Sequence, residues 1–168
     1  MLTSKLVPRY SFKAYSDITP GFLNAIGVRF LMIDLDNTIA RYSEQHPAES
    51  VIKWVADMNK NGIDLFIVSN SKRAHRVDEF SEVLGIGFTK SASKPSPKGL
   101  LFALENTSNS SGESALLGDQ VFTDVLAANR AGVTSIIVRP LSLKNPLLFL
   151  RFLVEAPFRA IGALRVRA

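Results

Sequence analysis

The hydrophobic pattern of this chain is a series of short apolar blocks separated by polar turns. Strands that are buried on both faces read as nearly unbroken apolar runs, and such runs recur along the sequence. The clearest is Phe30 to Ile33, inside a predicted strand over residues 28–34. Further strands are predicted over residues 63–69, 85–90, 114–117 and 134–138.

Segments with apolar residues at helical spacing lie between these strands. Thr19-Pro20 is typical of a helix start and Gly27 of a helix end, which predicts a short helix between them. Longer helices are predicted over residues 47–60, 74–84 and 121–131 and from Ser96-Pro97 onward, with a flexible surface loop over 106–112. Strands that alternate with helices favour right-handed βαβ units. We therefore expect an α/β fold, a three-layer α/β/α sandwich with a central parallel sheet.

The composition fits one folded domain. The chain has 168 residues, of which 46% are hydrophobic, enough to bury a sizeable core. It has no cysteine, which excludes disulfides, thiolate zinc sites and a cysteine nucleophile, and which fits a reducing compartment such as the cytoplasm. No signal peptide is visible, and no charge-free apolar run approaches the roughly 20 residues needed to span a bilayer.

The positive charge is concentrated at the carboxyl end. Residues 139–168 hold six basic residues and one acidic residue, Glu155. The net charge of this segment, +5, equals that of the whole chain. The preceding part of the chain is therefore neutral. We divide the chain into a main domain over residues 1–145 and a basic amphipathic tail over residues 146–168.

The tail reads as a helix with one narrow polar stripe. Arg151, Glu155 and Arg159 are spaced four apart, which places them on one face, and many of the remaining side chains are apolar. Pro157 is expected to kink or break the helix. Such a tail could lie in an anionic membrane interface as a peripheral anchor. Docking on the protein's own surface or on a partner protein is an equal alternative.

Side chains that could take part in catalysis or in binding follow the predicted strands or precede the next helix. They are, in chain order, Asp34, Asp36, Ser69, Asn70, Lys94, Asp119 and Asp124. The carboxyl ends of strands in an open parallel sheet meet at one edge, so we expect these residues to lie together. The carboxylates could supply a nucleophile, an acid/base and ligands for Mg²⁺. The hydroxyl, amide and ammonium groups could bind phosphate.

Together these motifs resemble the haloacid dehalogenase (HAD) superfamily of aspartate-nucleophile phosphatases. The resemblance implies that Asp34 is the nucleophile, Asp36 the general acid/base, Ser69 the second-motif hydroxyl and Lys94 the third-motif lysine. It also implies a Mg²⁺ cofactor. The implied ligands are Asp34, the backbone carbonyl of Asp36 and Asp119, with Asp124 as a direct or a water-mediated ligand. The second aspartate, Asp36, favours a phosphatase over a dehalogenase or a P-type ATPase.

Further motifs narrow the resemblance. Leu6-Val7-Pro8, Asp17-Ile18-Thr19-Pro20 and Asn129-Arg130-Ala131-Gly132 look like the YqeG-type proteins of subfamily IIIA, which are similar to phosphatidylglycerophosphate phosphatases. The resemblance covers about residues 1–145. It implies phosphatidylglycerophosphate as substrate and a place in phospholipid biosynthesis. The gaps from Thr38 to Ile63 and from Asn70 to Lys94 are too short for a cap domain, so the site should be open.

Other functions stay open on these residues. The substrate could be a nucleotide, a sugar phosphate or a phosphoprotein, or the chain could be a non-catalytic HAD-fold binding module. Nucleic-acid binding has little support, because the main domain is neutral and the tail has no Tyr or Trp on which bases could stack.

Several basic residues near the second and third motifs need a separate interpretation. Lys90 lies close to Lys94 and competes with it for the third-motif role. We interpret Lys72, Arg73 and Arg76 as part of a solvated helix face, with a place at the rim of the site as the alternative.

Overall fold

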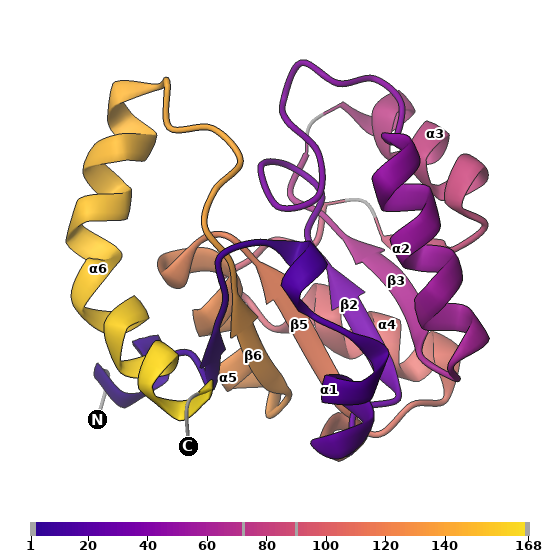
Figure 1. Ribbon diagram of the computed structural model, residues 1–168, viewed down its shortest axis with the longest axis horizontal. Coiled ribbons are helices and arrows are strands. Elements are labelled where there is room, and N and C mark those ends of the chain that lie inside the picture. The colour runs from indigo at the N-terminus through magenta and orange to yellow at the C-terminus, as the bar shows by residue number, and fades with distance from the viewer. Residues whose placement is uncertain (1–2, 72, 90, 167–168) are drawn as a thin grey trace.

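A six-stranded parallel sheet forms the centre of the protein. The computed structural model describes residues 3–71, 73–89 and 91–166 (Figure 1). The strand order is β1-β6-β5-β2-β3-β4, and all neighbouring strands are parallel. The strands are β1 (Tyr10–Ser11), β2 (Phe30–Ile33), β3 (Asp64–Val68), β4 (Gly87–Thr89), β5 (Ser114–Gly118) and β6 (Thr134–Ile137).

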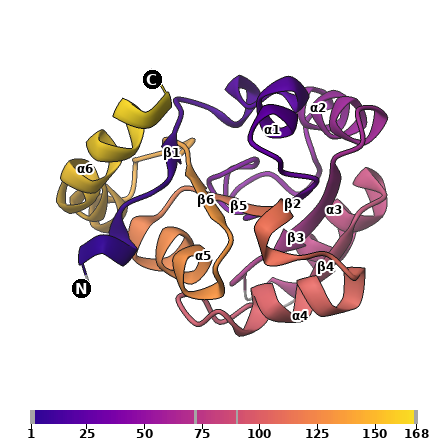
Figure 2. The same ribbon diagram turned by 90° about the horizontal axis from the view of Figure 1, so that it is seen from below.

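Helices cover both faces of the sheet (Figure 2). Helices α1 (Pro20–Ala25), α2 (Glu49–Lys60) and α3 (Ala74–Leu84) pack on one face, and α4 (Lys98–Thr107) and α5 (Leu126–Ala131) pack on the other. Successive side chains of a strand point to opposite faces. Accordingly, Leu31 and Ile33 of β2 belong to the core under α1, α2 and α3, whereas Phe30 and Met32 belong to the core under α4 and α5. The predicted α/β/α sandwich is confirmed, and the described residues form no separate cap domain.

The observed elements differ from the predicted ones mainly at the sheet edge and at element ends. Strand β1 was not predicted, because two residues are too few to show a period; it pairs with β6. The predicted helix over 121–131 begins as a π-helical turn, η4 (Val121–Val125). The predicted loop over 106–112 is partly ordered, since α4 extends to Thr107 and a 3₁₀ turn, η3 (Ser111–Glu113), precedes β5. Two more 3₁₀ turns, η1 (Thr3–Leu6) and η2 (Tyr15–Asp17), lie near the amino terminus.

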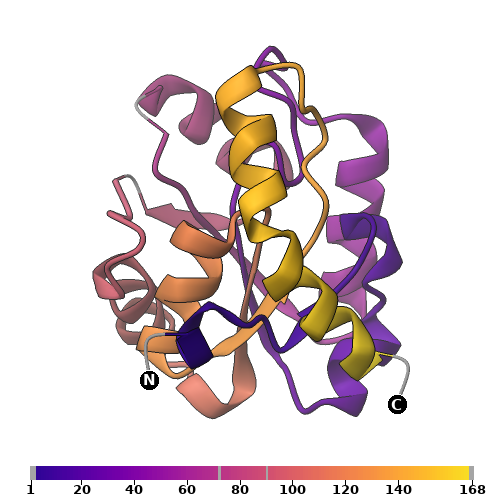
Figure 3. The same cartoon turned by 90° about the vertical axis from the view of Figure 1, so that its left-hand side faces the viewer.

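A long helix, α6 (Pro146–Val166), ends the described chain and runs beside β1 and η4 (Figure 3). It continues through Pro157, so the predicted break does not occur. Its axis bends along its length in Figure 3, which fits the milder effect of an internal proline. None of the described helices combines the length and the apolar character needed to cross a bilayer.

The loop after β2 is fixed to the segment that leads into α6. Asn37 has a positive φ of 66°, a left-handed conformation that asparagine tolerates better than most residues. Its side-chain amide donates to the carbonyl of Ser142 at 2.8 Å, and its side-chain oxygen accepts from the N–H of Ser142 at 2.8 Å. The chain therefore enters α6 from a point beside the carboxyl end of β2.

Candidate active site

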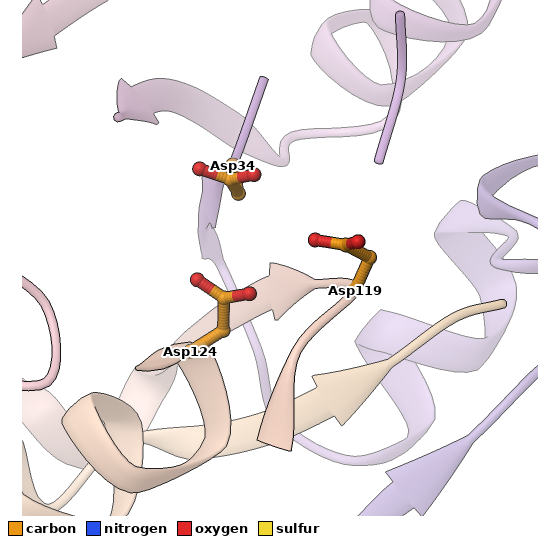
Figure 4. A group of neighbouring side chains, drawn as sticks. All are labelled: Asp34, Asp119 and Asp124. Atoms are coloured by element: carbon orange, nitrogen blue, oxygen red, sulfur yellow. The ribbon is translucent and has the colours of Figure 1, made fainter. Parts of the chain in front are cut away.

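Three buried carboxylates converge at the carboxyl edge of the sheet (Figure 4). Asp34 follows β2, Asp119 follows β5, and Asp124 lies in η4. One oxygen from each lies within 4.8 Å of the others. Their exposed fractions are 7%, 1% and 3%. Gly118 permits this approach, because a Cβ there would lie 2.3 Å from the carboxyl carbon of Asp124. The sheet thus brings together three side chains that lie up to ninety residues apart in sequence.

Lys94 places one ammonium group among these carboxylates. Its Nζ lies 2.6 Å from Oδ1 of Asp34 and 2.8 Å from Oδ1 of Asp124. Asn70 holds the backbone of Lys94 from both sides: its amide donates to the Lys94 carbonyl at 2.8 Å, and its oxygen accepts from the Lys94 N–H at 2.9 Å. Lys94 therefore bridges Asp34 and Asp124. The competing residue, Lys90, lies outside the described residues.

Two hydroxyl groups complete the inner part of the site. Ser69 is buried at the end of β3, where its Oγ accepts from the N–H of Ser71 at 3.0 Å. Thr38 Oγ1 lies 3.4 Å from both Asp34 Oδ2 and Asp119 Oδ1, so it lies between two of the carboxylates.

Asp36 lies outside the acidic group and has a different partner. Its carboxylate pairs with the guanidinium of Arg76, which is only 2% exposed. Arg76 also donates to the carbonyls of Glu44 at 2.6 Å and Arg41 at 2.9 Å. The interpretation of Arg76 as a solvated residue was therefore wrong. Its neighbours Val77 and Phe80 face the core. These two apolar residues in the sequence could have indicated that this side of α3 points inward.

The cavity at this edge has a volume of about 290 Å³. Six of the predicted residues line it: Asp34, Asp36, Ser69, Asn70, Lys94 and Asp124. Asp119 lies in the acidic group without lining the cavity. Arg73 also lines the cavity, so the alternative interpretation, a place at the rim, holds for this residue. The sequence analysis did not single out the remaining lining residues, which are Tyr42, Ser71, Gln120 and Thr123. Lys72 lies outside the described residues.

In the buried acidic group, the three carboxylates outnumber the one ammonium group of Lys94 that contacts them. Burial, opposed by Lys94 and assisted by Asp124, raises the pKa of Asp34 to about 7. Burial and the neighbouring carboxylates Asp124 and Asp34 raise the pKa of Asp119 well above its usual value. Burial opposes the charge of Lys94, but Asp124 and Asp34 outweigh this effect and raise its pKa. A divalent cation would relieve this excess charge, and three carboxylate oxygens are the ligands that Mg²⁺ prefers. The residues present fit such an ion.

Comparisons with known proteins agree with this geometry. Residues 14–132 match the model of the haloacid dehalogenase-like hydrolase family. A Bacillus subtilis (strain 168) protein named "Probable phosphatase YqeG" is 34% identical over 165 residues, which is 98% of this chain and 95% of the relative.

Solved structures share the fold at lower identity. The 3-deoxy-D-manno-octulosonate 8-phosphate phosphatase of Yersinia pestis is 16% identical with a TM-score of 0.52, over 86% of each chain. The corresponding Moraxella catarrhalis enzyme, in complex with magnesium, phosphate and KDO, is 14% identical with a TM-score of 0.51. The match covers 81% of this chain and 92% of that enzyme.

The raised pKa of Asp34 predicts how stability responds to pH without metal. The folded state holds this proton more tightly than the unfolded state, so the carboxyl group costs stability as the pH rises from about 4 to about 7. Asp34→Asn removes the titration. Urea unfolding is measured with a chelator present. The free energy of unfolding of the variant, relative to that of the wild type, should increase by up to about 1.4 kcal/mol per pH unit across that range. A difference that does not change with pH would contradict the raised pKa.

Proposed function

The chain belongs to the haloacid dehalogenase-like hydrolases, and from this premise we propose that it is a Mg²⁺-dependent phosphomonoesterase whose substrate is phosphatidylglycerophosphate. The observation that carries the proposal is the buried Asp34 carboxylate, which lines an open cavity together with Lys94, Ser69 and Asn70. A carboxylate nucleophile beside a cation and phosphate-binding donors suits the attack on a phosphate ester.

The proposed reaction has two steps, in both of which Asp34 and Asp36 act. The Asp34 carboxylate attacks phosphorus and forms an aspartyl-phosphate while the ester oxygen leaves, and Asp36 donates a proton to that oxygen. Asp36 then takes a proton from a water molecule, which attacks the aspartyl-phosphate and releases inorganic phosphate and free Asp34. Asp36 lines the same cavity as Asp34, and the contact with Arg76 holds it there.

The phosphoryl group would meet the remaining polar residues of the cavity. Lys94 would balance the charge of its oxygens, and the hydroxyl of Ser69 and the amide of Asn70 would orient it. Asp34, the backbone carbonyl of Asp36 and Asp119 would hold Mg²⁺, with Asp124 as a direct or water-mediated ligand. The ion would neutralise charge on the transferring group.

Two observations support a lipid substrate. The described residues contain no cap domain over the cavity, so a phosphate presented at a surface could reach Asp34. The second is the outward face of α6. It exposes a row of large apolar side chains at helical spacing, with Leu147 at 76%, Leu150 at 59% and Val154 at 54%.

The helix that carries this apolar face stands beside the site. In Figure 1, the amino-terminal half of α6 and the loop before α2 rise on either side of the carboxyl edge of the sheet. Arg151 of α6 donates to the side chain of Gln120, which lines the cavity. Exposed Lys144 and Arg151 add positive charge. We propose that this face lies on an anionic membrane, as a peripheral contact that brings lipid headgroups to the cavity.

Phosphate release tests the activity and the substrate together. With Mg²⁺, the wild type should release phosphate from phosphatidylglycerophosphate in vesicles, and Asp34→Asn should reduce the rate by roughly 10³-fold or more, because the nucleophile is lost. A panel of nucleotides, sugar phosphates and a phosphopeptide serves as the comparison. Release from these esters alone would contradict the lipid substrate but retain the mechanism. No release from any ester would contradict the enzymatic proposal as a whole.

Vesicle binding tests the apolar face of α6. Leu150→Ser/Val154→Ser should weaken co-sedimentation with phosphatidylglycerol vesicles by about 10-fold or more, because two apolar side chains no longer enter the interface. The matched control is Leu101→Ser/Phe102→Ser, which changes two exposed apolar residues of α4. Equal binding by both variants and the wild type would remove the membrane role from α6.

A further inference from the structure

The polar stripe of α6 faces inward, and its two buried members form an ion pair. Glu155 is 1% exposed and Arg159 is 8% exposed, whereas the apolar residues described above face outward. The carboxylate of Glu155 and the guanidinium of Arg159 lie 2.8 Å apart, one helical turn from each other. An amphipathic helix usually turns its charges to solvent. In α6, by contrast, two charged side chains face the protein and the large apolar ones face solvent.

Glu155 caps the turn that carries Asp124. Its Oε1 accepts from the backbone N–H groups of Val121 at 2.9 Å and Phe122 at 3.2 Å, the first two residues of η4. N–H groups at the start of a helical turn lack partners within the turn and favour a negative charge. Within the described chain, Gln120 makes no side-chain cap at this position. The cap therefore comes from α6, thirty-four residues away.

Arg159 contacts Asp119, which lies shortly before η4 in the chain. Its Nη2 donates to the backbone carbonyl of Asp119, and its Nη1 donates to the carbonyl of Val138 at 2.9 Å. The guanidinium thus joins the residue after β5 to the residue after β6. Through Glu155 and Arg159 together, α6 contacts three residues in the stretch from Asp119 to Asp124, namely Asp119, Val121 and Phe122.

The position of this pair is not explained by stability alone. A buried ion pair often contributes less to stability than well-packed apolar side chains would. Among the described residues, Nε of Arg159 is also buried without a hydrogen-bond partner, which adds a cost. The acidic site beside this ion pair offers a reason for its burial. Asp34, Asp119 and Asp124 lie within 4.8 Å of one another, where ionised carboxylates repel, so a held backbone would help Lys94 to keep them close before a cation arrives.

We propose that Glu155 and Arg159 are positioning residues for the metal site. They fix the backbone from Asp119 to Asp124, so that both carboxylates stay near Asp34. The inference rests on the proposed function only for the identity of the ion. It makes α6 part of the apparatus that binds the cation, in addition to any contact that its outer face makes. Groups that hold metal ligands in place typically change metal affinity by about 10- to 100-fold when they are lost.

The test measures cation binding without substrate. Mg²⁺ and Mn²⁺ affinities are determined by calorimetry on metal-free wild type, Glu155→Gln and Glu155→Ala. Glutamine keeps an oxygen that can accept the two N–H groups but loses the charge, whereas alanine loses both. We expect weakening of about 10-fold or more for alanine and a smaller loss for glutamine, with unchanged folding by circular dichroism. With an aryl phosphate substrate, the variants should recover activity as Mg²⁺ is raised, with an unchanged KM for the ester.

The matched control is an exposed pair of the same spacing. Glu49 and Lys53 of α2 lie 2.6 Å apart and are mostly exposed, so Glu49→Gln should leave cation affinity unchanged. Cation affinity of Glu155→Ala within twofold of the wild type would overturn the proposal, as would a wild type that binds neither cation. If Glu155→Ala does not fold, the isosteric Glu155→Gln decides by the same criterion. Because calorimetry needs no substrate, the result holds whether or not phosphatase activity is found.

Discussion

The repulsion among three buried carboxylates is the constraint on which the rest of the site depends. Asp34, Asp119 and Asp124 meet in a buried place, where the one charge of Lys94 does not balance three carboxylates. Each neighbouring element acts on this charge. Asn70 fixes the backbone of Lys94, and Thr38 lies between two of the carboxylates. Helix α6 bonds to the backbone of Asp119, Val121 and Phe122. A site built in this way is prepared for a divalent cation and for the charge of a phosphoryl group.

The sequence predicted the parts of the site that follow from local pattern. Asp34 and Asp119 stand directly after buried apolar strands, and in a parallel sheet those positions must share an edge. The strand order itself did not follow from the pattern, and neither did β1, whose two residues pair with β6 through long-range contacts. The helix after β5 begins at Val121 as predicted, but the π-helical form of its first turn was not foreseen, because π-helical and α-helical turns present similar apolar spacing.

Arg76 and α6 show what a single sequence leaves undetermined. The spacing of Arg151, Glu155 and Arg159 predicts a stripe, but spacing does not say which side of a helix faces the protein. The answer depends on the N–H groups of Val121 and Phe122 and on the carbonyl of Asp119, which a charged stripe can satisfy and an apolar one cannot. Arg76 is similar, since its partners Asp36, Glu44 and Arg41 lie more than thirty residues away.

The most direct test of the account is to identify the residue that becomes phosphorylated during turnover. The enzyme would be mixed with Mg²⁺ and a ³²P-labelled phosphomonoester, quenched in acid within milliseconds, digested and analysed by mass spectrometry. We predict a hydroxylamine-sensitive phosphate on Asp34. Phosphate on any other residue, or turnover without a covalent phosphoenzyme, would contradict the assignment of Asp34 as the nucleophile at the centre of the acidic site.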